Sequence, residues 1–109
     1  MEVWQEITEN ERLLTELNAT LLPNWIKFAD AERKYRIAKA KAILKLRNAG
    51  CPTTLITDIV KGDQDVADLN FERMVAEAEY KSNIEAINVA KQKANDLRMY
   101  FESEWRNTK

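Results

Sequence analysis

Basic side chains recur at helical spacing in the first half of the chain. Lys27, Lys34 and Lys41 are seven residues apart, and Lys45 follows four residues later. Because seven residues make nearly two helical turns, these four lysines, the basic ridge, would form a line of charge with about 10 Å between neighbours. Such a line could follow the phosphates of a nucleic acid or of another polyanion. The candidate polyanion-binding residues are Lys27, Arg33, Lys34, Lys41, Lys45 and Arg47.

The simpler interpretation of the basic ridge is a helix face that meets only water. No aromatic residue is interleaved on that face, and binding of single strands relies on rings that stack against bases. The formal net charge is −1, whereas a nucleic-acid module is usually basic in total. We therefore favour the solvated face and keep binding of a nucleic acid or a nucleotide signal as the alternative function.

The densest group of carboxylates lies at residues 63–72. On a helix, Asp65, Asp68 and Glu72 would share one face, which suits a divalent cation. The calcium-loop pattern is missing, because no glycine follows within the acidic run. Helical nucleotide hydrolases use two paired-carboxylate motifs around magnesium, and the second one here, Glu6 with Glu9, would lie at the opposite end of a hairpin. Capping and solvation of a helix start is the favoured interpretation, with a divalent-metal nucleotide hydrolase as the second alternative.

The chain has few groups that could perform catalysis. It contains no histidine, so the commonest general base and metal ligand is missing. Its one cysteine, Cys51, stands in a turn between Gly50 and Pro52 without a histidine to activate it. There is also no glycine-rich phosphate loop. We therefore expect a protein that is not an enzyme, with no catalytic residues, no metal and no cofactor.

Turn-forming residues are scarce, which indicates an all-α fold. Two glycines and two prolines in 109 residues cannot supply the frequent turns of a β-sandwich or barrel. Gly50 and Pro52 end a first helix, Thr53 and Thr54 are expected to cap a short one, and Gly62 closes it. The expected helices are 2–49, 53–61 and 63–107, in a single domain over 1–109.

Pro23 poses the main structural question. Inside a helix, proline removes a hydrogen bond and clashes with the carbonyl four residues back. The apolar phase nevertheless runs through it, so we favour one helix over 2–49, kinked at Pro23, over two separate helices. The expected seam of that helix is Val3, Ile7, Asn10, Leu14, Leu17, Leu21, Asn24, Phe28, Ala31, Tyr35, Ala38 and Ala42. The seam expected in the last helix is Leu69, Arg73, Ala76, Tyr80, Asn83, Ile87, Ala90, Ala94, Leu97 and Phe101.

Pairing these seams predicts a long antiparallel helical hairpin of coiled-coil type, with the short helix as its connection. Charge supports the pairing, since residues 1–22 and 48–80 are acidic and residues 23–47 and 81–109 are basic. Many apolar residues lie outside the seams, so we expect two chains to dimerise into a helical bundle. The expected core and interface residues are Leu14, Leu17, Leu21, Phe28, Tyr35, Ala38, Ala42, Ala76, Tyr80, Ile87, Ala94, Leu97 and Phe101.

Several motifs between residues 31 and 105 resemble a known group of proteins. They include Ala31-Glu32-Arg33-x-Tyr35, Leu46-Arg47-x-x-Gly50-x-Pro52-x-x-Leu55-Ile56, Val66-Ala67-x-Leu69, Ala76-Glu77-x-x-Tyr80-Lys81, Glu85-Ala86-Ile87-Asn88 and Glu104-Trp105. The chain is similar to small all-helical accessory proteins of temperate phages and prophages of Gram-positive bacteria. The resemblance implies a phage accessory protein in the host cytoplasm, of the size class that includes recombination helpers, transcriptional modulators and antagonists of host defence. It implies no catalytic residues.

The function we expect is therefore protein–protein interaction. The partners would be a second copy of the chain and a host or phage protein, with nucleic acid less favoured and no membrane, because no apolar run approaches the ~20 residues that span a bilayer. Connectors held on a rigid scaffold are common binding sites. The candidate partner-binding tip is Cys51, Thr53, Thr54, Lys61 and Asp63.

Overall fold

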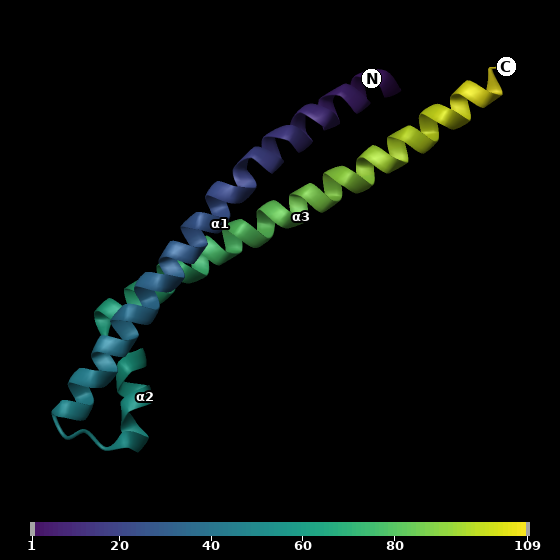
Figure 1. The fold of residues 1–109 in the computed structure, drawn as a ribbon. Coiled ribbons are helices and arrows are strands. Elements are labelled where there is room, and N and C mark those ends of the chain that lie inside the picture. The colour runs from purple at the N-terminus through teal and green to yellow at the C-terminus, as the bar shows by residue number, and fades with distance from the viewer. Residues whose placement is uncertain (1, 109) are drawn as a thin grey trace. The chain divides into compact units, whose positions relative to one another are not determined.

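The computed structural model describes residues 2–108, and over that range the chain is helical with no strand (Figure 1). The elements are α1 (Val3–Asn48), α2 (Thr53–Lys61) and α3 (Gln64–Asn107). The all-α fold class is thereby confirmed. Contacts divide the chain into two compact parts. We call the residues up to Pro23 together with those from Lys81 unit 1, and Asn24–Tyr80 unit 2.

Helix α1 continues through Pro23. Proline lies inside the helix, although it cannot donate the usual backbone hydrogen bond to the preceding turn. The seam of mainly apolar residues on both sides of Pro23 accounts for this continuity, because packing along a stripe stabilises a helix more than one hydrogen bond does. Lys45 and Arg47 lie in the last turn, where cations complement the helix dipole.

The turn after α1 depends on Gly50, whose φ is +81°. The amide of Gly50 donates to the carbonyl of Arg47 at 3.1 Å, and the amide of Cys51 donates to the carbonyl of Leu46 at 3.0 Å. These two bonds close the helix as a Schellman motif, which needs the left-handed residue that glycine tolerates best.

The caps of the next two helices differ from each other. The N-cap of α2 is Pro52, so the expectation that Thr53 and Thr54 cap this helix is wrong, and both threonines lie in its first turn. Proline fixes the extended approach but offers no side-chain oxygen as an acceptor. At the start of α3, Asp63 does act as a cap, since its carboxylate accepts a hydrogen bond from the amide of Val66 at 3.1 Å.

In unit 1, segments of α1 and α3 pack antiparallel, and two polar side chains lie in the contact between them. The side-chain amide of Asn10 donates to the carbonyl of Ala90 at 2.9 Å, and that of Asn83 donates to the carbonyl of Leu17 at 3.0 Å. The Thr20 hydroxyl lies 3.1 Å from the side-chain oxygen of Asn83. Asn10 is 4% exposed and Asn83 is 7% exposed. The two asparagines of the expected seams are therefore buried and bonded to the opposite helix.

In unit 2, α1 and α3 also run antiparallel, and their contacts are rings and ion pairs. The rings of Phe28 and Tyr80 stack with centroids 6.1 Å apart. Lys27 pairs with Glu79 at 2.9 Å, and Arg73 reaches Glu32 at 3.5 Å. These pairs place the first residues of the α1 segment beside the last residues of the α3 segment.

Helix α2 supplies the apolar core of unit 2. Ile56 and Val60 of α2 are buried with Val66 of α3, and Val60 is 2% exposed. α2 lies beside the last turns of α1 (Figure 1). The partly buried residues packed against this core are Tyr35, Ala38, Ala42, Ile43, Leu46 and Cys51.

The expected seam positions follow this packing. All twelve in α1 are partly or fully buried. In α3 the same holds from Leu69 to Leu97, whereas Phe101 is 43% exposed. Ala76, Ile87 and Ala90 of α3 are buried, and two of these three are alanines, whose small side chain allows close approach of the helices.

Candidate functional site

Two cavities that share Lys34 lie between α1 and α3 in unit 2. Their volumes are about 330 and 600 Å³. Together we call them the unit 2 groove. The first is lined by Lys27, Asp30, Ala31, Lys34, Phe71, Glu72, Val75 and Ala76. The second is lined by Lys34, Ile37, Ala38, Lys41, Asp65, Asp68 and Leu69.

The groove brings together two sets of residues that the sequence suggests for separate chemistries. Lys27, Lys34 and Lys41 of the basic ridge line its α1 side. The carboxylate group of residues 65, 68 and 72 lines its α3 side. Apolar residues lie between the two charged rows. This face of unit 2 is therefore an apolar strip with a positive border along one helix and a negative border along the other.

Local ion pairs occupy part of the basic ridge. Lys27 pairs with Glu79, and Lys34 pairs with Asp30 at 3.0 Å. Hydrogen bonds from Arg33 and then Lys34 hold the pKa of Asp30 below its ordinary value. Within residues 2–108, no carboxylate lies within ion-pair distance of Lys41.

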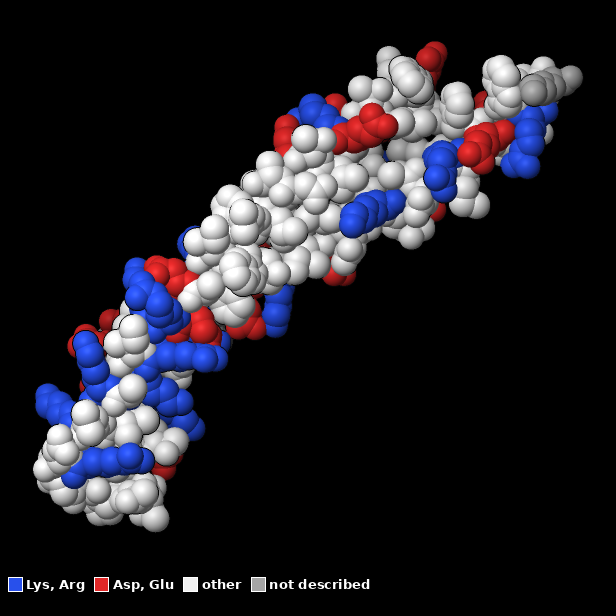
Figure 2. Space-filling view, in the orientation of Figure 1, with Lys and Arg blue, Asp and Glu red and all other residues white. Residues whose placement is uncertain are grey.

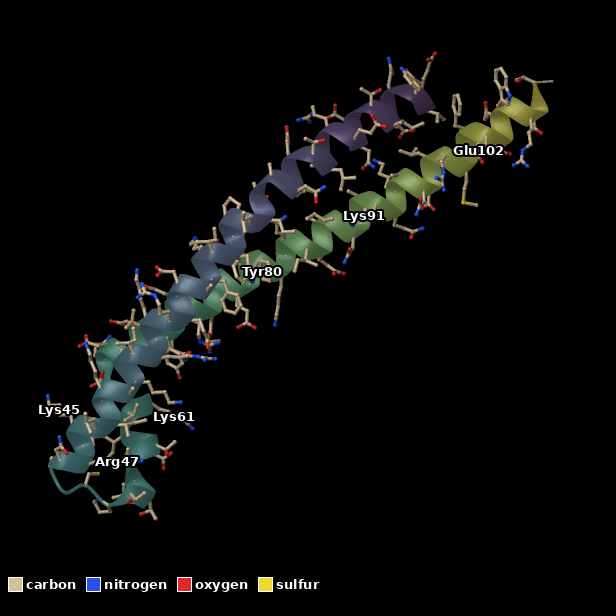
Figure 3. The ribbon with its side chains drawn as sticks, viewed as in Figure 1. Lys45, Arg47, Lys61, Tyr80, Lys91 and Glu102 are labelled. Carbon is tan, nitrogen blue, oxygen red and sulfur yellow. The ribbon has the colours of Figure 1, made fainter. Side chains whose placement is uncertain are left out.

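The other three basic candidates, Arg33, Lys45 and Arg47, do not line the groove, and Arg33 pairs with Asp30 at 2.7 Å. Lys45 and Arg47 are at the end of α1 beside α2, and Lys61 is at the end of α2 (Figure 3). Lys and Arg side chains gather over this part of the surface (Figure 2). Lys45 and Arg47 are both exposed, so this end of unit 2 presents positive charge to solvent.

The carboxylates of α3 do not gather into a metal site. Among the residues that the structure describes, no three Asp, Glu or Cys side chains are grouped so that they could hold a metal ion. Asp68 accepts a hydrogen bond from the side-chain amide of Gln64 at 2.8 Å. Asp65 and Glu72 line different cavities of the groove.

The expected tip is divided between core and surface. Cys51 is partly buried against the α2 core, and its Sγ lies 3.8 Å from the carbonyl of Pro52. Thr53, Thr54 and Lys61 are exposed, while the carboxylate of Asp63 caps α3. The apolar residues Leu55 and Ile59, 50% and 46% exposed and four residues apart on α2, add a surface that the sequence analysis missed.

A third cavity, of about 530 Å³, lies in unit 1 and was also missed from the sequence. The aromatic rings that line it come from Trp4, Tyr100, Phe101 and Trp105. The carboxylates of Glu2 and Glu104 border it, and a hydrogen bond to Glu104 raises the pKa of Tyr100. The signal available in the sequence was the presence of aromatic residues near both ends, Trp4 in one segment and Tyr100, Phe101 and Trp105 in the other.

Large apolar side chains are exposed along both units. Over the described range, the buried hydrophobic residues are Ile56, Val60, Val66, Ala76, Ile87 and Ala90. The large hydrophobic residues exposed by 40% or more are Trp4, Leu13, Leu22, Trp25, Ile26, Ile37, Leu44, Leu55, Ile59, Phe71, Met74, Val75, Val89, Met99, Tyr100, Phe101 and Trp105. In the described part of the chain, no helix is both long and apolar enough to cross a membrane.

No protein family model, curated protein or solved structure matches the chain.

Proposed function

We propose that this protein is a non-enzymatic interaction module that works as a homodimer and binds a partner protein. In this proposal α1 and α3 pair as a helical hairpin, and two chains pack as a helical bundle. The observation that carries it is the contrast between few buried and many exposed apolar side chains. A protein that stays alone in water rarely leaves so much apolar surface uncovered.

Self-association is the first step, because it covers apolar surface with a surface already at hand. Two helices bury only one stripe each, and a bundle buries a second face of both. A two-fold dimer uses the same patch twice, so a single chain can encode it. The exposed residues Ile37, Phe71 and Val75 support this step, since they border or line one continuous groove.

The partner protein is the second step. The motifs that resemble those of phage and prophage accessory proteins are the basis for proposing a host or phage protein as the target, with a role in host defence, recombination or transcription. Thr53, Thr54 and Lys61 are exposed on α2, next to the apolar residues Leu55 and Ile59. A rigid helical scaffold that presents such a surface is suited to bind one face of a folded protein.

Polyanion binding is the second candidate function, and one observation favours it. Lys45 and Arg47 are exposed in the last turn of α1, and Lys61 is exposed in the last turn of α2. The ion pairs of Lys27 and Lys34 reduce the charge that the rest of the ridge offers to phosphates. For a divalent-metal hydrolase at the α3 carboxylates, no observation speaks in favour.

Sedimentation equilibrium tests the first step. At micromolar concentration we expect a mass about twice the 12.7 kDa of one chain. A mass of one chain would overturn the homodimer.

Affinity purification from an expressing host tests the second step. We expect a protein to be recovered at a salt concentration that removes nucleic acid, because an apolar interface responds little to salt. Neutralising about four phosphates would instead give a log–log slope near −3 to −4. Recovery of polyanions alone, abolished by Lys34→Glu with Lys41→Glu, would contradict a protein partner.

A further inference from the structure

The unit 2 groove is asymmetric in charge from one side to the other. Its α1 side carries Lys34 and Lys41, and its α3 side carries Asp65 and Glu72. The seam residues Ala38 and Leu69 line the same cavity between the two rows, and Ile37, which is 44% exposed, also lines it. A surface with opposite charges along its two borders can complement itself.

The two charged rows are also matched in level along the helices. Lys27 pairs with Glu79, and Glu32 pairs with Arg73, so residues of α1 and α3 that stand side by side are fixed by contacts. Continuing that register places Lys34 level with Glu72 and Lys41 level with Asp65. Each of these two pairs lines a single cavity, in agreement with that register.

Two copies of this face can meet about a two-fold axis in only two simple ways. An axis that runs across the helices sets α1 against the partner's α1, so that lysine rows face each other and carboxylate rows face each other. An axis parallel to the helices sets α1 against the partner's α3, so that each lysine row faces a carboxylate row at the same level. Juxtaposed like charges oppose association and opposite charges favour it, so charge selects the second arrangement.

We propose that the unit 2 groove is the docking surface for a second copy of this chain, with the two-fold axis parallel to the helices. Lys34 then faces the partner's Glu72, and Lys41 faces the partner's Asp65. The proposal rests on the homodimer proposed above and adds which face meets which. Docking covers Ile37, Phe71 and Val75, which are 44%, 69% and 40% exposed in the single chain.

The local ion pair of Lys34 is compatible with this arrangement. An ammonium group has three donors, so Lys34 can keep Asp30 and also reach the partner's Glu72. Lys41 has no such competing carboxylate within ion-pair distance among the described residues. Lys41 therefore gains its first ion-pair partner on association, the partner's Asp65, whereas Lys34 already has one within its own chain.

Charge reversal in the full chain tests the arrangement. The basic-side variant carries Lys34→Glu and Lys41→Glu, the acidic-side variant carries Asp65→Lys and Glu72→Lys, and the combined variant carries all four. We expect each two-site variant to raise the dimer dissociation constant by about tenfold or more, and the combined variant to restore it. With an axis across the helices, the basic-side variant would associate like the wild type and the combined variant would gain nothing.

A mixture of the two two-site variants shows whether the restoration acts between chains. Each variant keeps its own intrachain repulsion in the mixture, so recovered association there can come only from contacts between copies. Lys91→Glu with Lys93→Glu, two exposed sites in unit 1, is the matched control and should leave association unchanged. Helical circular dichroism verifies that every variant is folded.

A variant without charge reversal covers the case in which the reversed chains do not fold. Val75→Asp places a charge on a side chain that is 40% exposed in the single chain, so the helix should persist while the dimer dissociates. A wild-type dimer that Val75→Asp leaves intact, or that the basic-side variant leaves intact, would overturn this docking surface and spare the homodimer. A monomeric wild type would overturn both.

Discussion

Units 1 and 2 pair segments of the same two helices by different means. In unit 1 the helices are joined by Asn10 and Asn83, which are buried and bonded to backbone carbonyls of the opposite helix. In unit 2 they are joined by a ring stack and ion pairs, and a third helix covers one side. The difference shows two ways of adding to an apolar seam: buried polar side chains in unit 1, and rings, ion pairs and a third helix in unit 2.

The seam of unit 1 combines buried apolar residues, such as Ile87 and Ala90, with the two buried asparagines. Each asparagine amide is satisfied by a backbone carbonyl of the opposite helix, and a buried amide without such an acceptor would be destabilising. Unit 2 obtains burial from α2, which packs Ile56 and Val60 against α1 and α3. The face of unit 2 that carries the groove is where our proposal places the second copy.

The largest effect should come from the α2 core. Val60→Asp would bury a carboxylate without a partner at a site that is 2% exposed, and we expect a loss of more than about 4 kcal/mol in the free energy of unfolding. Ile59→Asp, its neighbour at 46% exposure, is the control and should lose far less. Urea unfolding followed by circular dichroism measures both. Equal losses would mean that α2 does not pack as described.

Unit 1 should respond less to the loss of a polar contact. Asn83→Ala removes the donor to the Leu17 carbonyl and should reduce the free energy of unfolding by about 1–2 kcal/mol. Asn95→Ala, at an exposed site on the same helix, is the matched control. The same urea titration applies. A loss no greater than that of the control would contradict the role of the buried amide.

Replacing each of the two glycines by alanine should change the stability in opposite directions. Gly50→Ala forces a Cβ into a left-handed conformation at φ +81° and should destabilise by about 1 kcal/mol. Gly62 has φ −90°, and an added Cβ would meet only the Ile59 carbonyl at 3.7 Å, so Gly62→Ala should stabilise by roughly 0.4–1 kcal/mol. Thermal unfolding distinguishes them. Two shifts of the same sign would refute the assigned turn geometry.

The smallest expected effect is on stability at acid pH, where one carboxylate in each unit has a lowered pKa. A hydrogen bond from Arg12 lowers the pKa of Glu9, and hydrogen bonds from Arg33 and Lys34 lower that of Asp30. A lowered pKa in the folded state gives stability that is present above the unfolded pKa and is lost as pH falls through the folded value. Asp30→Asn should therefore flatten the stability profile slightly below about pH 4. NMR titration of the Asp30 carboxyl would contradict this if its pKa were not lowered.

Much of the helical pattern can be predicted from the sequence, because glycine, proline and the spacing of apolar residues determine helix ends and faces locally. Gly50 and Asp63 end and begin helices through their own backbone and side-chain chemistry. The cap of α2 was wrongly predicted at Thr53 and Thr54, because their hydroxyls favour a cap position, whereas the observed N-cap, Pro52, has no side-chain oxygen. The kink at Pro23, the full hairpin and the dimer remain predictions.

The groove could not be predicted as one site. Its lysines and carboxylates lie on helices some 30 residues apart in sequence, and only the register between α1 and α3 sets Lys41 in one cavity with Asp65 and Asp68. The sequence indicates each set through its spacing, but register depends on tertiary contacts such as Lys27 with Glu79. The cavity in unit 1 was missed for the same reason.

The central claim is that a second copy of the chain covers the open apolar face of unit 2. Sedimentation equilibrium of Ile37→Asp beside Met99→Asp tests it most directly, since the two side chains are 44% and 63% exposed and only Ile37 lines the groove. We predict that Ile37→Asp sediments as a single chain of 12.7 kDa and that Met99→Asp remains a dimer. A dimer of undiminished affinity for Ile37→Asp would contradict the account.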